Sequence, residues 1–409
     1  MKKLAFVTPW YGDTIPGGAE MELRGISKHL KASGIDVEIL TTCIEKFSSD
    51  WNTNFHKAGV TEEGGLTVRR FKVRKRDTKG FDAINFKLMN DQPVTADEEK
   101  YFIQEMVNST DLYDYIRDHK DDYSLFVFIP YMFGTTYYGI KACPEKSVMI
   151  PCLHDESYAY MDIYKDVFEN MAGAIYHAQN EYVLANKIYD LSKVKQAVLG
   201  EGIDTDFTYD ADRFRETSGI KDPFILYAGR KDAGKNIYLL LDYFREYRKR
   251  HEDSSLKLVL IGGGEIDIPA DIKSEVIDMG YVDKQVKYDA CAAALTLCQP
   301  SIHESFSLVL MESWLCERPA LVHADCDVTR GFAQESNSAL YFKDFYEFEG
   351  CIEYYIKHKE IAAEMGKTGR EFVLKNFKWD IIVDKYTEFF ESVAANTQSN
   401  DGGKEDDIS

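Results

Sequence analysis

Short apolar runs alternate with helix-like stretches along most of the chain, and this alternation constrains the fold more than any other feature. The run at 4–7 predicts a buried strand, 19–33 predicts an amphipathic helix, and 37–41 predicts a second strand. A strand, a helix and a strand in this order form a βαβ unit, the start of a parallel doubly wound sheet. Because the alternation continues to residue 199, the first half of the chain predicts one complete α/β domain.

A second cycle of strands and helices begins after the charged stretch 210–222, which we interpret as a linker between domains. Its predicted strands are 224–227, 256–261, 276–279, 295–298 and 320–322. A chain of 409 residues is long enough for two such domains. The predicted fold class is therefore α/β, with two tandem Rossmann-like, doubly wound domains and a ligand cleft between the carboxyl ends of their strands.

Four stretches lie outside this alternation. Residues 44–95 are polar and predict a long loop or a small insertion around one basic strand, whereas 97–119 predicts a single long helix. The segment 380–395 predicts an amphipathic helix. The acidic residues that follow, 396–409, predict a disordered tail.

The charge balance excludes one broad class of function. A net charge of -20 and an isoelectric point near 5.0 argue against general nucleic-acid binding, because a phosphate backbone is held by clustered Lys and Arg. A local basic run does occur at 69–79. We interpret it first as the solvated face of an exposed strand, and second as a contact for anionic lipid or an anionic acceptor.

The eight cysteines form no C-x-x-C pair and lie mostly inside apolar runs. This distribution predicts reduced, buried thiols in a cytosolic protein. The apolar run at the N-terminus has only the length of a strand, and no later run approaches the ~18 apolar residues of a membrane helix. The sequence thus predicts a cytoplasmic protein, with peripheral docking at the inner face of a membrane as an open alternative.

The segment 303–314 combines two carboxylates with a predicted strand-to-helix junction. Glu304 follows the apolar run 295–298, at a place where helix N–H groups and the positive end of the dipole favour phosphate or sugar oxygens. Glu312 lies eight residues further on, roughly 12 Å along the helix, so the two carboxylates are too far apart to share a proton. This separation suits an extended ligand. The alternative is that Ser305 caps the helix and Glu312 is a solvated charge.

Basic residues follow the predicted strand 224–227. Gly229 and Arg230 come soon after it, and Lys235 follows within a flexible loop. The planar fork of Arg and the mobile point charge of Lys together suit the two sides of a diphosphate. Without the other motifs, an ordinary surface loop would explain this stretch equally well.

Several other strand ends carry groups that can face a ligand. His154 ends the strand predicted at 148–153, where it could hydrogen-bond a hydroxyl, polarise it or act as a base, although a lone His is more often structural. Glycine turns, which let a ligand approach the backbone, follow three more strands: Gly17 with Gly18, Gly262 to Gly264, and Gly280 with Tyr281 and Val282. The sequence contains no nucleophile elbow, zinc-protease helix, P-loop or metal-spaced cluster of His and carboxylates.

Taken in this order, the motifs resemble the family 4 retaining glycosyltransferases of the GT-B fold. The resemblance covers nearly all of residues 1–395, and its most specific part is the Arg and Lys together with the two glutamates. It implies an acceptor-side domain at 1–208 and a donor-binding domain at 209–379. It also implies that the last helix, 380–395, crosses back onto the first domain, leaving 396–409 as the tail.

The resemblance implies a role for each motif. Arg230 and Lys235 would neutralise the donor diphosphate without a metal, and His154 would contact the donor sugar near the reacting centre. Glu304 would bind sugar hydroxyls, and Glu312 would bind the nucleotide ribose. The other donor-binding positions that it implies are Gly17, Gly18, Gly229, Gly263, Tyr281, Val282, Ser305, Phe306, Ser307 and Leu308. It implies no cofactor and no metal.

Three positions depart from the family pattern. Ser305 and Ser307 stand where glycines commonly flank Phe306, which makes them the residues best placed to distinguish this donor from that of a relative. Glu201 stands where the family commonly has Asn, close to the turn between the domains.

The resemblance implies transfer of a sugar from a nucleotide-diphosphate sugar to a saccharide or lipid-linked acceptor, in cell-surface polysaccharide biosynthesis. Glu304 and Glu312 are too far apart to act as the two carboxylates of a retaining glycosidase. We therefore predict front-side substitution, in which the leaving phosphate accepts the acceptor's proton. Alternatives on the same fold are a sugar phosphorylase, a nucleotide-sugar epimerase, or a non-catalytic subunit that binds sugar nucleotides.

Overall fold

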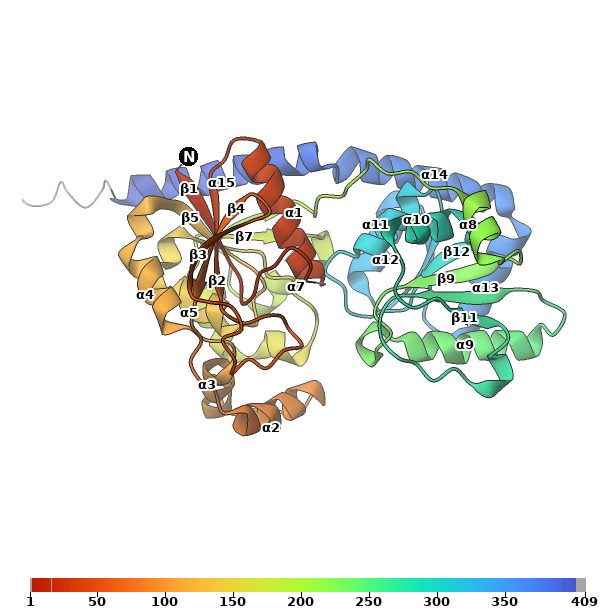
Figure 1. Ribbon diagram of the computed structural model, residues 1–409, viewed down its shortest axis with the longest axis horizontal. Helices are drawn as coiled ribbons and strands as arrows, with labels where there is room; N and C mark the ends of the chain where they lie inside the picture. Colours follow the sequence, from red (N-terminus) through yellow and green to blue (C-terminus); the bar gives the residue numbers. More distant parts are fainter. Residues whose placement is uncertain (1, 16, 402–409) are drawn as a thin grey trace, which may run out of the picture. The chain divides into compact units, whose positions relative to one another are not determined.

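The computed structural model describes residues 2–15 and 17–401, which form two compact α/β units (Figure 1). Unit 1 comprises Met1–Gly202 and Trp379–Ser409, and unit 2 comprises Ile203–Lys378. Each unit is built around one mainly parallel sheet, which confirms the predicted fold class. The division after Gly202 lies slightly before residue 208, where the sequence analysis ends the first domain.

The sheet of unit 1 has the strand order β3-β4-β2-β1-β5-β6-β7-β8, and it is parallel except for β3, which runs antiparallel to β4. Leu4 to Val7 are fully buried, as expected of a central strand that helices cover on both faces. The strands are β1 Lys3–Val7, β2 Val37–Thr42, β3 Gly59–Glu63, β4 Leu66–Phe71, β5 Tyr123–Phe128, β6 Ser147–Met149, β7 Gly173–Tyr176 and β8 Lys195–Val198.

Helices and short 3-10 turns connect the strands of unit 1. The α-helices are α1 Gly18–Ala32, α2 Thr78–Met89, α3 Ala96–Glu105, α4 Thr110–Asp118, α5 Gly134–Ala142, α6 Lys165–Phe168, α7 Gln179–Ile188 and α15 Trp379–Asp401. The 3-10 turns are η1 Lys120–Asp122, η2 Pro144–Lys146, η3 Ser157–Tyr160 and η4 Asp162–Tyr164.

The last helix, α15, packs inside unit 1, where Figure 1 draws it in blue beside the red and orange elements. The Trp379 ring stacks on the His29 ring with centroids 4.2 Å apart, and the Phe390 ring packs edge-on against Phe6 at 6.4 Å. Gly202 permits this close approach, because a Cβ at that position would lie 2.1 Å from the Trp379 indole. The C-terminal segment is therefore part of the first unit's core.

The sheet of unit 2 is parallel throughout, with the order β11-β10-β9-β12-β13-β14. Its strands are β9 Phe224–Ala228, β10 Lys257–Ile261, β11 Val276–Asp278, β12 Thr296–Gln299, β13 Ala320–His323 and β14 Ala339–Phe342. Its α-helices are α8 Ala211–Ser218, α9 Ile237–Arg250, α10 Lys284–Ala293, α11 Leu308–Leu315, α12 Asp327–Ser336, α13 Phe345–Lys357 and α14 Lys359–Asn376. Two 3-10 turns complete it, η5 Ala233–Lys235 and η6 Ala270–Ile272.

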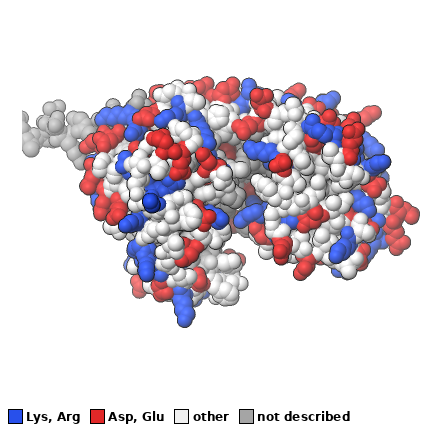
Figure 2. All heavy atoms as spheres, in the orientation of Figure 1, with Lys and Arg blue, Asp and Glu red and all other residues white. Residues whose placement is uncertain are grey.

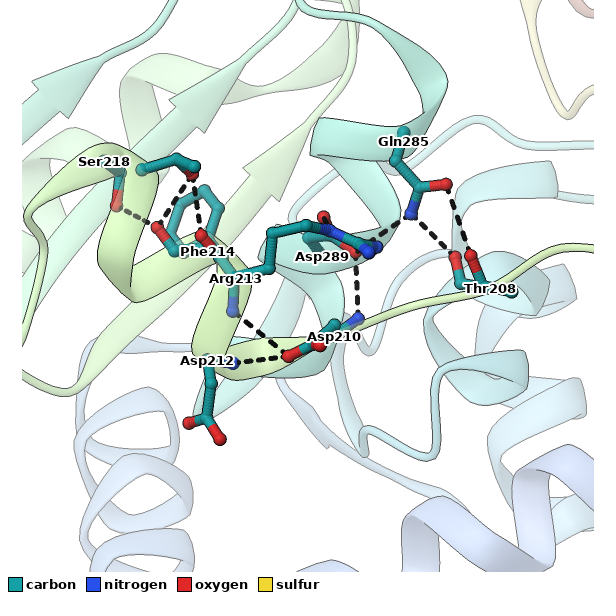
Figure 3. Close-up of polar contacts among 9 residues, drawn as sticks. Thr208, Asp210, Asp212, Arg213, Phe214, Ser218, Gln285 and Asp289 are labelled. Atoms are coloured by element: carbon teal, nitrogen blue, oxygen red, sulfur yellow. Dashed lines mark hydrogen bonds and ion pairs between the residues drawn. The ribbon is translucent and has the colours of Figure 1, made fainter.

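The charged stretch 210–222 is not a linker but an integral part of unit 2. It contains helix α8, whose Arg213 forms an ion pair with Asp289 of α10, with donor–acceptor distances of 2.5 and 2.6 Å (Figure 3). The backbone N–H of Asp210 donates to the same carboxylate at 2.9 Å. The Asp289 side chain is buried, so these contacts hold α8 against α10 within unit 2.

The basic run at 69–79 is also better integrated than the sequence pattern indicated. It begins in β4, which forms an antiparallel pair with β3, and the polar region around it contains α2 as well. The guanidinium of Arg70 is buried and pairs with Glu63 at 2.5 and 2.9 Å, while Arg69 pairs with Glu38 at 2.9 Å. The prediction of a solvated face is therefore wrong for Arg70. Its charge is buried, and the Glu63 carboxylate on the neighbouring strand β3 neutralises that charge.

Two further predictions of local structure need correction. The segment 97–119 forms two helices, α3 and α4, and the Ser109 hydroxyl between them donates to the Lys72 carbonyl at 2.7 Å. Helix α15 continues to Asp401, so the first residues of the predicted disordered tail are helical, and the rest of that tail lies outside the described residues. None of the described helices combines the length and apolar composition that a membrane span requires.

Candidate functional site

Parallel strands place the predicted donor-binding loops along one edge of the unit 2 sheet. The neighbouring strands β11, β10, β9 and β12 run in the same direction, so the loops that follow them emerge at the same edge. These loops carry Gly229, Arg230 and Lys235 after β9, Gly263 after β10, Tyr281 and Val282 after β11, and Glu304 to Ser307 after β12. The topology therefore gathers motifs that are far apart in the sequence.

Glu304 is held by side chains that come from two different strand ends. Nζ of Lys235 lies 2.7 Å from Oε1 of Glu304, and Nε2 of Gln299 donates to the same oxygen at 2.8 Å. Asn236 donates to the carbonyl oxygen of Pro300 at 3.0 Å and so joins the loop after β9 to the loop after β12. The structure thus brings Glu304 and Lys235 together as an ion pair, with only 10% of the Glu304 side chain exposed.

Arg230 lies in the same loop as Lys235 but extends into solvent. Its side chain is 69% exposed, and its Nε is 3.5 Å from the Asp232 carboxylate. The Tyr227 hydroxyl donates to the carbonyl oxygen of Arg230, which anchors the backbone and leaves the guanidinium able to turn. The loop therefore presents one anchored cation and one exposed cation.

Backbone hydrogen bonds join the glycine turns along this edge. The N–H of Gly229 donates to Ile261 at 2.9 Å, and the N–H of Gly262 donates to Gly280 at 2.8 Å. Gly262 has a φ of 132°, and a Cβ there would lie 1.9 Å from the Gly229 carbonyl oxygen, so this position requires glycine. A Cβ on Gly263 would meet no atom within 4 Å, which leaves its backbone accessible.

Lys231 is a residue that the sequence analysis missed, although it is adjacent to Arg230. Its side chain is buried, and its Nζ lies 2.6 Å from both carboxylate oxygens of Asp278 at the end of β11. Asp278 also accepts a hydrogen bond from the N–H of Gly280 at 2.9 Å. This buried pair supports the turn that carries Tyr281, whose side chain is 87% exposed and offers an aromatic face to a ligand.

Glu312 is not the solvated charge of the alternative interpretation. Both of its carboxylate oxygens accept hydrogen bonds from Lys287 Nζ, at 2.6 and 2.7 Å, and the Tyr288 hydroxyl lies 3.4 Å away. Its side chain is 14% exposed. Lys287 and Tyr288 belong to α10, so the pair joins α10 to α11. No signal in the sequence connected Glu312 with this lysine.

The segment before α11 also differs from the alternative interpretation. The N-cap of α11 is Ser307 and not Ser305, and the Ser307 side chain makes no capping hydrogen bond. Phe306 is buried, and its ring packs against Phe332 and Phe377. Leu308 is the first residue of the helix. The backbone from Phe306 to Leu308 is therefore anchored by Phe306 at the start of α11.

The remaining predicted residues lie in unit 1. His154 follows β6, and its Nδ1 is 3.7 Å from the Glu156 carboxylate, which accepts from the Tyr131 hydroxyl at 3.2 Å. Gly17 precedes α1 with a φ of 141°, and a Cβ there would lie 1.9 Å from the Glu20 carboxylate. A Cβ on Gly18 would meet no atom within 4 Å, so α1 begins with an accessible backbone.

A buried polar cluster at the ends of β6 and β7 was not predicted. Nε2 of His177 lies 2.5 Å from Oε1 of Glu22. The carboxylate of Glu181 accepts from the backbone N–H groups of His177 and Leu153, both at 2.7 Å. Since Leu153 directly precedes His154, Glu181 anchors the backbone that carries His154. The sequence holds no local signal for this cluster, because His177 and Glu22 are 155 positions apart.

Electrostatics keep His177 protonated in this cluster. Burial alone would lower the pKa of His177, but the carboxylates of Glu22 and Glu181 outweigh burial and raise this pKa to about 10. Burial also raises the pKa of Glu181. Cys152, Glu22 and His177 place possible metal-ligand atoms within 4.8 Å of one another, but in this structure His177 and Glu22 bond directly to each other. We therefore interpret the cluster as a buried charge pair.

Comparison with known proteins identifies one family model and several relatives. A family model described as glycosyl transferases group 1 matches residues 209–372. One relative is N-acetylgalactosamine-N,N'-diacetylbacillosaminyl-diphospho-undecaprenol 4-alpha-N-acetylgalactosaminyltransferase of Campylobacter jejuni, which is 33% identical to this chain over 135 residues. The aligned residues make up 31% of this chain and 34% of that protein. The chain is 24% identical over 186 residues to a trehalose synthase of Thermococcus litoralis, covering 42% and 44%. These matches span less than half the length of either relative.

Solved structures resemble the chain over almost its whole length. Sucrose-phosphate synthase from Thermosynechococcus elongatus has a TM-score of 0.69 at 17% identity, with 97% of this chain and 100% of that chain covered. HepE of Anabaena, in complex with UDP and glucose, has a TM-score of 0.65 at 14% identity, with 96% and 100% covered. At these identities the likeness establishes the fold. Residues 209–372 thus match the model of the group 1 glycosyl transferases, and the chain shares the GT-B fold of these solved structures, with two Rossmann-like units.

Proposed function

We propose that this protein transfers a sugar from a nucleoside-diphosphate sugar to a saccharide or lipid-linked acceptor. The observation that carries the proposal is the pairing of Lys235 with Glu304 at 2.7 Å, in the loops at the carboxyl edge of the unit 2 sheet. A sugar nucleotide offers a diphosphate, which a lysine can neutralise, and sugar hydroxyls, which a carboxylate can accept. The family match over residues 209–372 supports the same assignment.

The proposed reaction transfers the sugar with retention and without a metal. The bond between the sugar's anomeric carbon and the diphosphate oxygen breaks on the same face as the new bond to the acceptor oxygen forms. The acceptor's proton moves to the leaving phosphate. Arg230 and Lys235 stabilise the developing charge on the diphosphate, and the exposed position of Arg230 leaves it able to turn toward that charge.

The other predicted residues bind and orient the donor. Glu304 accepts hydrogen bonds from sugar hydroxyls, and Glu312 accepts from the ribose once Lys287 has moved aside. Tyr281 offers its exposed ring to the nucleobase. The roles predicted for His154 and Gly18, which belong to unit 1, stay predictions.

The chemistry of the acceptor is the second part of the proposal. The name of the Campylobacter jejuni relative describes a sugar transferred to a saccharide on diphospho-undecaprenol, which favours a lipid-linked acceptor. A role in cell-surface polysaccharide synthesis is part of the proposal. A peripheral membrane contact would rest on Lys72, Lys75 and Lys79, which are exposed. Figure 2 shows acidic and basic side chains interleaved over the drawn face. A contact through these three lysines would be sensitive to salt.

A donor screen tests the proposal. Thermal shift with UDP-, GDP-, dTDP- and ADP-sugars should identify one nucleotide class that stabilises the protein. With that donor and an acceptor extract, the nucleoside diphosphate should be released faster than with donor alone, and the product should keep the donor's anomeric configuration. Absence of stabilisation by every donor would contradict the assignment. Loss of transfer in EDTA would contradict the metal-free part, and an inverted product would contradict retention.

A further inference from the structure

Ser307 combines two unfavourable features at one position. Its backbone has a φ of 87° and a ψ of 80°. Gly, Asn and Asp tolerate this left-handed conformation, whereas other residues rarely adopt it. It is also buried, with 7% of its surface exposed, and its Oγ has no hydrogen-bond partner within the described part of the chain. A strained backbone and an unsatisfied buried hydroxyl both destabilise a folded protein, so their coincidence requires an explanation.

The neighbouring residues hold Ser307 in this conformation. The Phe306 ring packs edge-on against Phe332 and Phe377, with centroids 5.4 and 5.0 Å away. On the other side, the N–H groups of Leu310 and Met311 donate to the Ser307 carbonyl at 3.2 and 3.4 Å. The carbonyl thus starts helix α11, while the hydroxyl takes no part in capping it. The structure therefore leaves the hydroxyl uncommitted.

The surroundings of this hydroxyl favour an anion. It stands at the start of α11, where backbone N–H groups and the helix dipole attract negative charge, and the first turn of α11 contains no acidic side chain. The nearby carboxylate of Glu304 is already paired with Lys235. Gln299, which donates to Glu304, has a second buried atom without a partner among the described residues, its Oε1. Unsatisfied polar atoms therefore occur both before and after Glu304.

We propose that the Ser307 hydroxyl donates a hydrogen bond to a phosphoryl oxygen of the donor's diphosphate. This inference rests on the proposed function and assigns a contact to the side chain in addition to the backbone. A phosphoryl oxygen accepts the hydroxyl proton and also lies favourably at the helix N-terminus. Glycine would relieve the backbone strain but has no hydroxyl. A serine at this position therefore makes the ligand-free protein less stable than glycine would, and it adds a hydrogen bond to the bound donor.

Two substitutions of Ser307 separate strain from binding. The probes are UDP, GDP, dTDP and ADP, and the one that binds the unmodified protein most tightly is used throughout. Ser307→Gly is expected to raise the Tm of the ligand-free protein and to weaken diphosphate binding about tenfold, the effect of losing one hydrogen bond to a charged group. Ser307→Ala is expected to weaken binding to the same extent without raising the Tm.

Asn337→Gly is the matched control, because exposed Asn337 ends α12 with a φ of 53°. It changes backbone strain in the same unit and should leave diphosphate affinity unchanged. Binding of the corresponding nucleoside, which has no phosphate, should be the same in unmodified and Ser307→Gly protein.

The possible outcomes distinguish a failure of this inference from a failure of the proposed function on which it rests. Undiminished diphosphate affinity in both Ser307 variants would overturn the inference and leave the proposed function standing. Equal weakening for nucleoside and diphosphate would also overturn it, because the lost contact would then lie outside the phosphates. Failure of the unmodified protein to bind any of the four diphosphates would overturn the proposed function and this inference together.

Discussion

Nζ of Lys235 lies 2.7 Å from Oε1 of Glu304, so the cation and the carboxylate that were expected to hold different parts of one ligand are bonded to each other. Gln299 donates to the same carboxylate oxygen, which keeps Glu304 in place if Lys235 turns away. A bound diphosphate must therefore compete with Glu304 for Lys235. Substitutions in this pair change both the ligand contact and the pairing.

We expect Lys235→Met to weaken binding of the nucleoside diphosphate by about 1.5–3 kcal/mol, the range for a hydrogen bond to a charged group. Glu304→Gln alone should strengthen this binding, because the diphosphate no longer competes with a carboxylate for Lys235, and this gain should differ once Lys235 is Met. Titration calorimetry on the two single variants and the double variant measures this coupling.

The control for this cycle is Lys249→Met on helix α9. Lys249 is exposed and lies 3.5 Å from Glu246, so its loss removes a similar charge without touching the pair. Diphosphate affinity should be unchanged in this variant. Strictly additive effects of the two substitutions on diphosphate affinity would show that Lys235 and Glu304 act independently.

Lys287 neutralises Glu312 from the neighbouring helix. Lys287→Met leaves a carboxylate with little exposure and no cation beside it, so we expect the free energy of unfolding to fall by about 1–2 kcal/mol. Lys287→Met combined with Glu312→Gln should recover part of this loss, since no charge is then left unpaired. Urea denaturation followed by circular dichroism measures both. A double variant that is no more stable than Lys287→Met would argue against charge neutralisation as the role of Lys287.

The buried carboxylate of Glu181 holds two backbone N–H groups together, those of His177 and Leu153. We expect Glu181→Ala to lower the free energy of unfolding by about 3 kcal/mol, because it leaves buried donors and the His177 cation without this acceptor. Glu181→Gln should be milder, since its amide oxygen can still accept one hydrogen bond. Equilibrium denaturation compares the three proteins, and equal stability of all three would contradict the anchoring role.

The raised pKa of His177 predicts a pH dependence of stability. Its folded pKa of about 10 lies above the unfolded value of about 6.5, so the protonated form stabilises the folded state. This stabilisation is fully present below about pH 6.5 and is lost as the pH rises toward 10. The groups that face His177 are Glu22, Glu181, Glu201 and Cys152, and burial raises the pKa of Cys152 as well.

Denaturant melts between pH 6 and pH 10 test this dependence. The unmodified protein should lose stability across this range more steeply than His177→Gln, which has no proton to release. Parallel profiles for the two proteins would mean that another group is responsible. Should His177→Gln fail to fold, Glu22→Gln serves instead, because it removes the largest interaction that raises the pKa.

Much of the fold could be predicted from local patterns, and the exceptions have a common cause. The apolar runs that became β1, β2, β9 and β12 lie in central or near-central strands, where burial on both faces leaves a clear signal. The break between α3 and α4 was missed because periodicity continues across it, while the hydroxyl that stabilises the break bonds to the distant residue Lys72. Arg70 was placed in solvent because its partner Glu63 lies on a strand that the local pattern did not reveal.

Local sequence patterns specify most of the strands and helices, their occurrence in two cycles, and the loops that follow the central strands. Those properties depend on the spacing of apolar residues, which neighbouring positions record. The charge partners depend on the three-dimensional fold: Lys235 for Glu304, Lys287 for Glu312, Asp278 for Lys231, and Glu22 for His177. A charged side chain pairs with whichever opposite charge the chain topology brings within reach, and no local pattern records that choice.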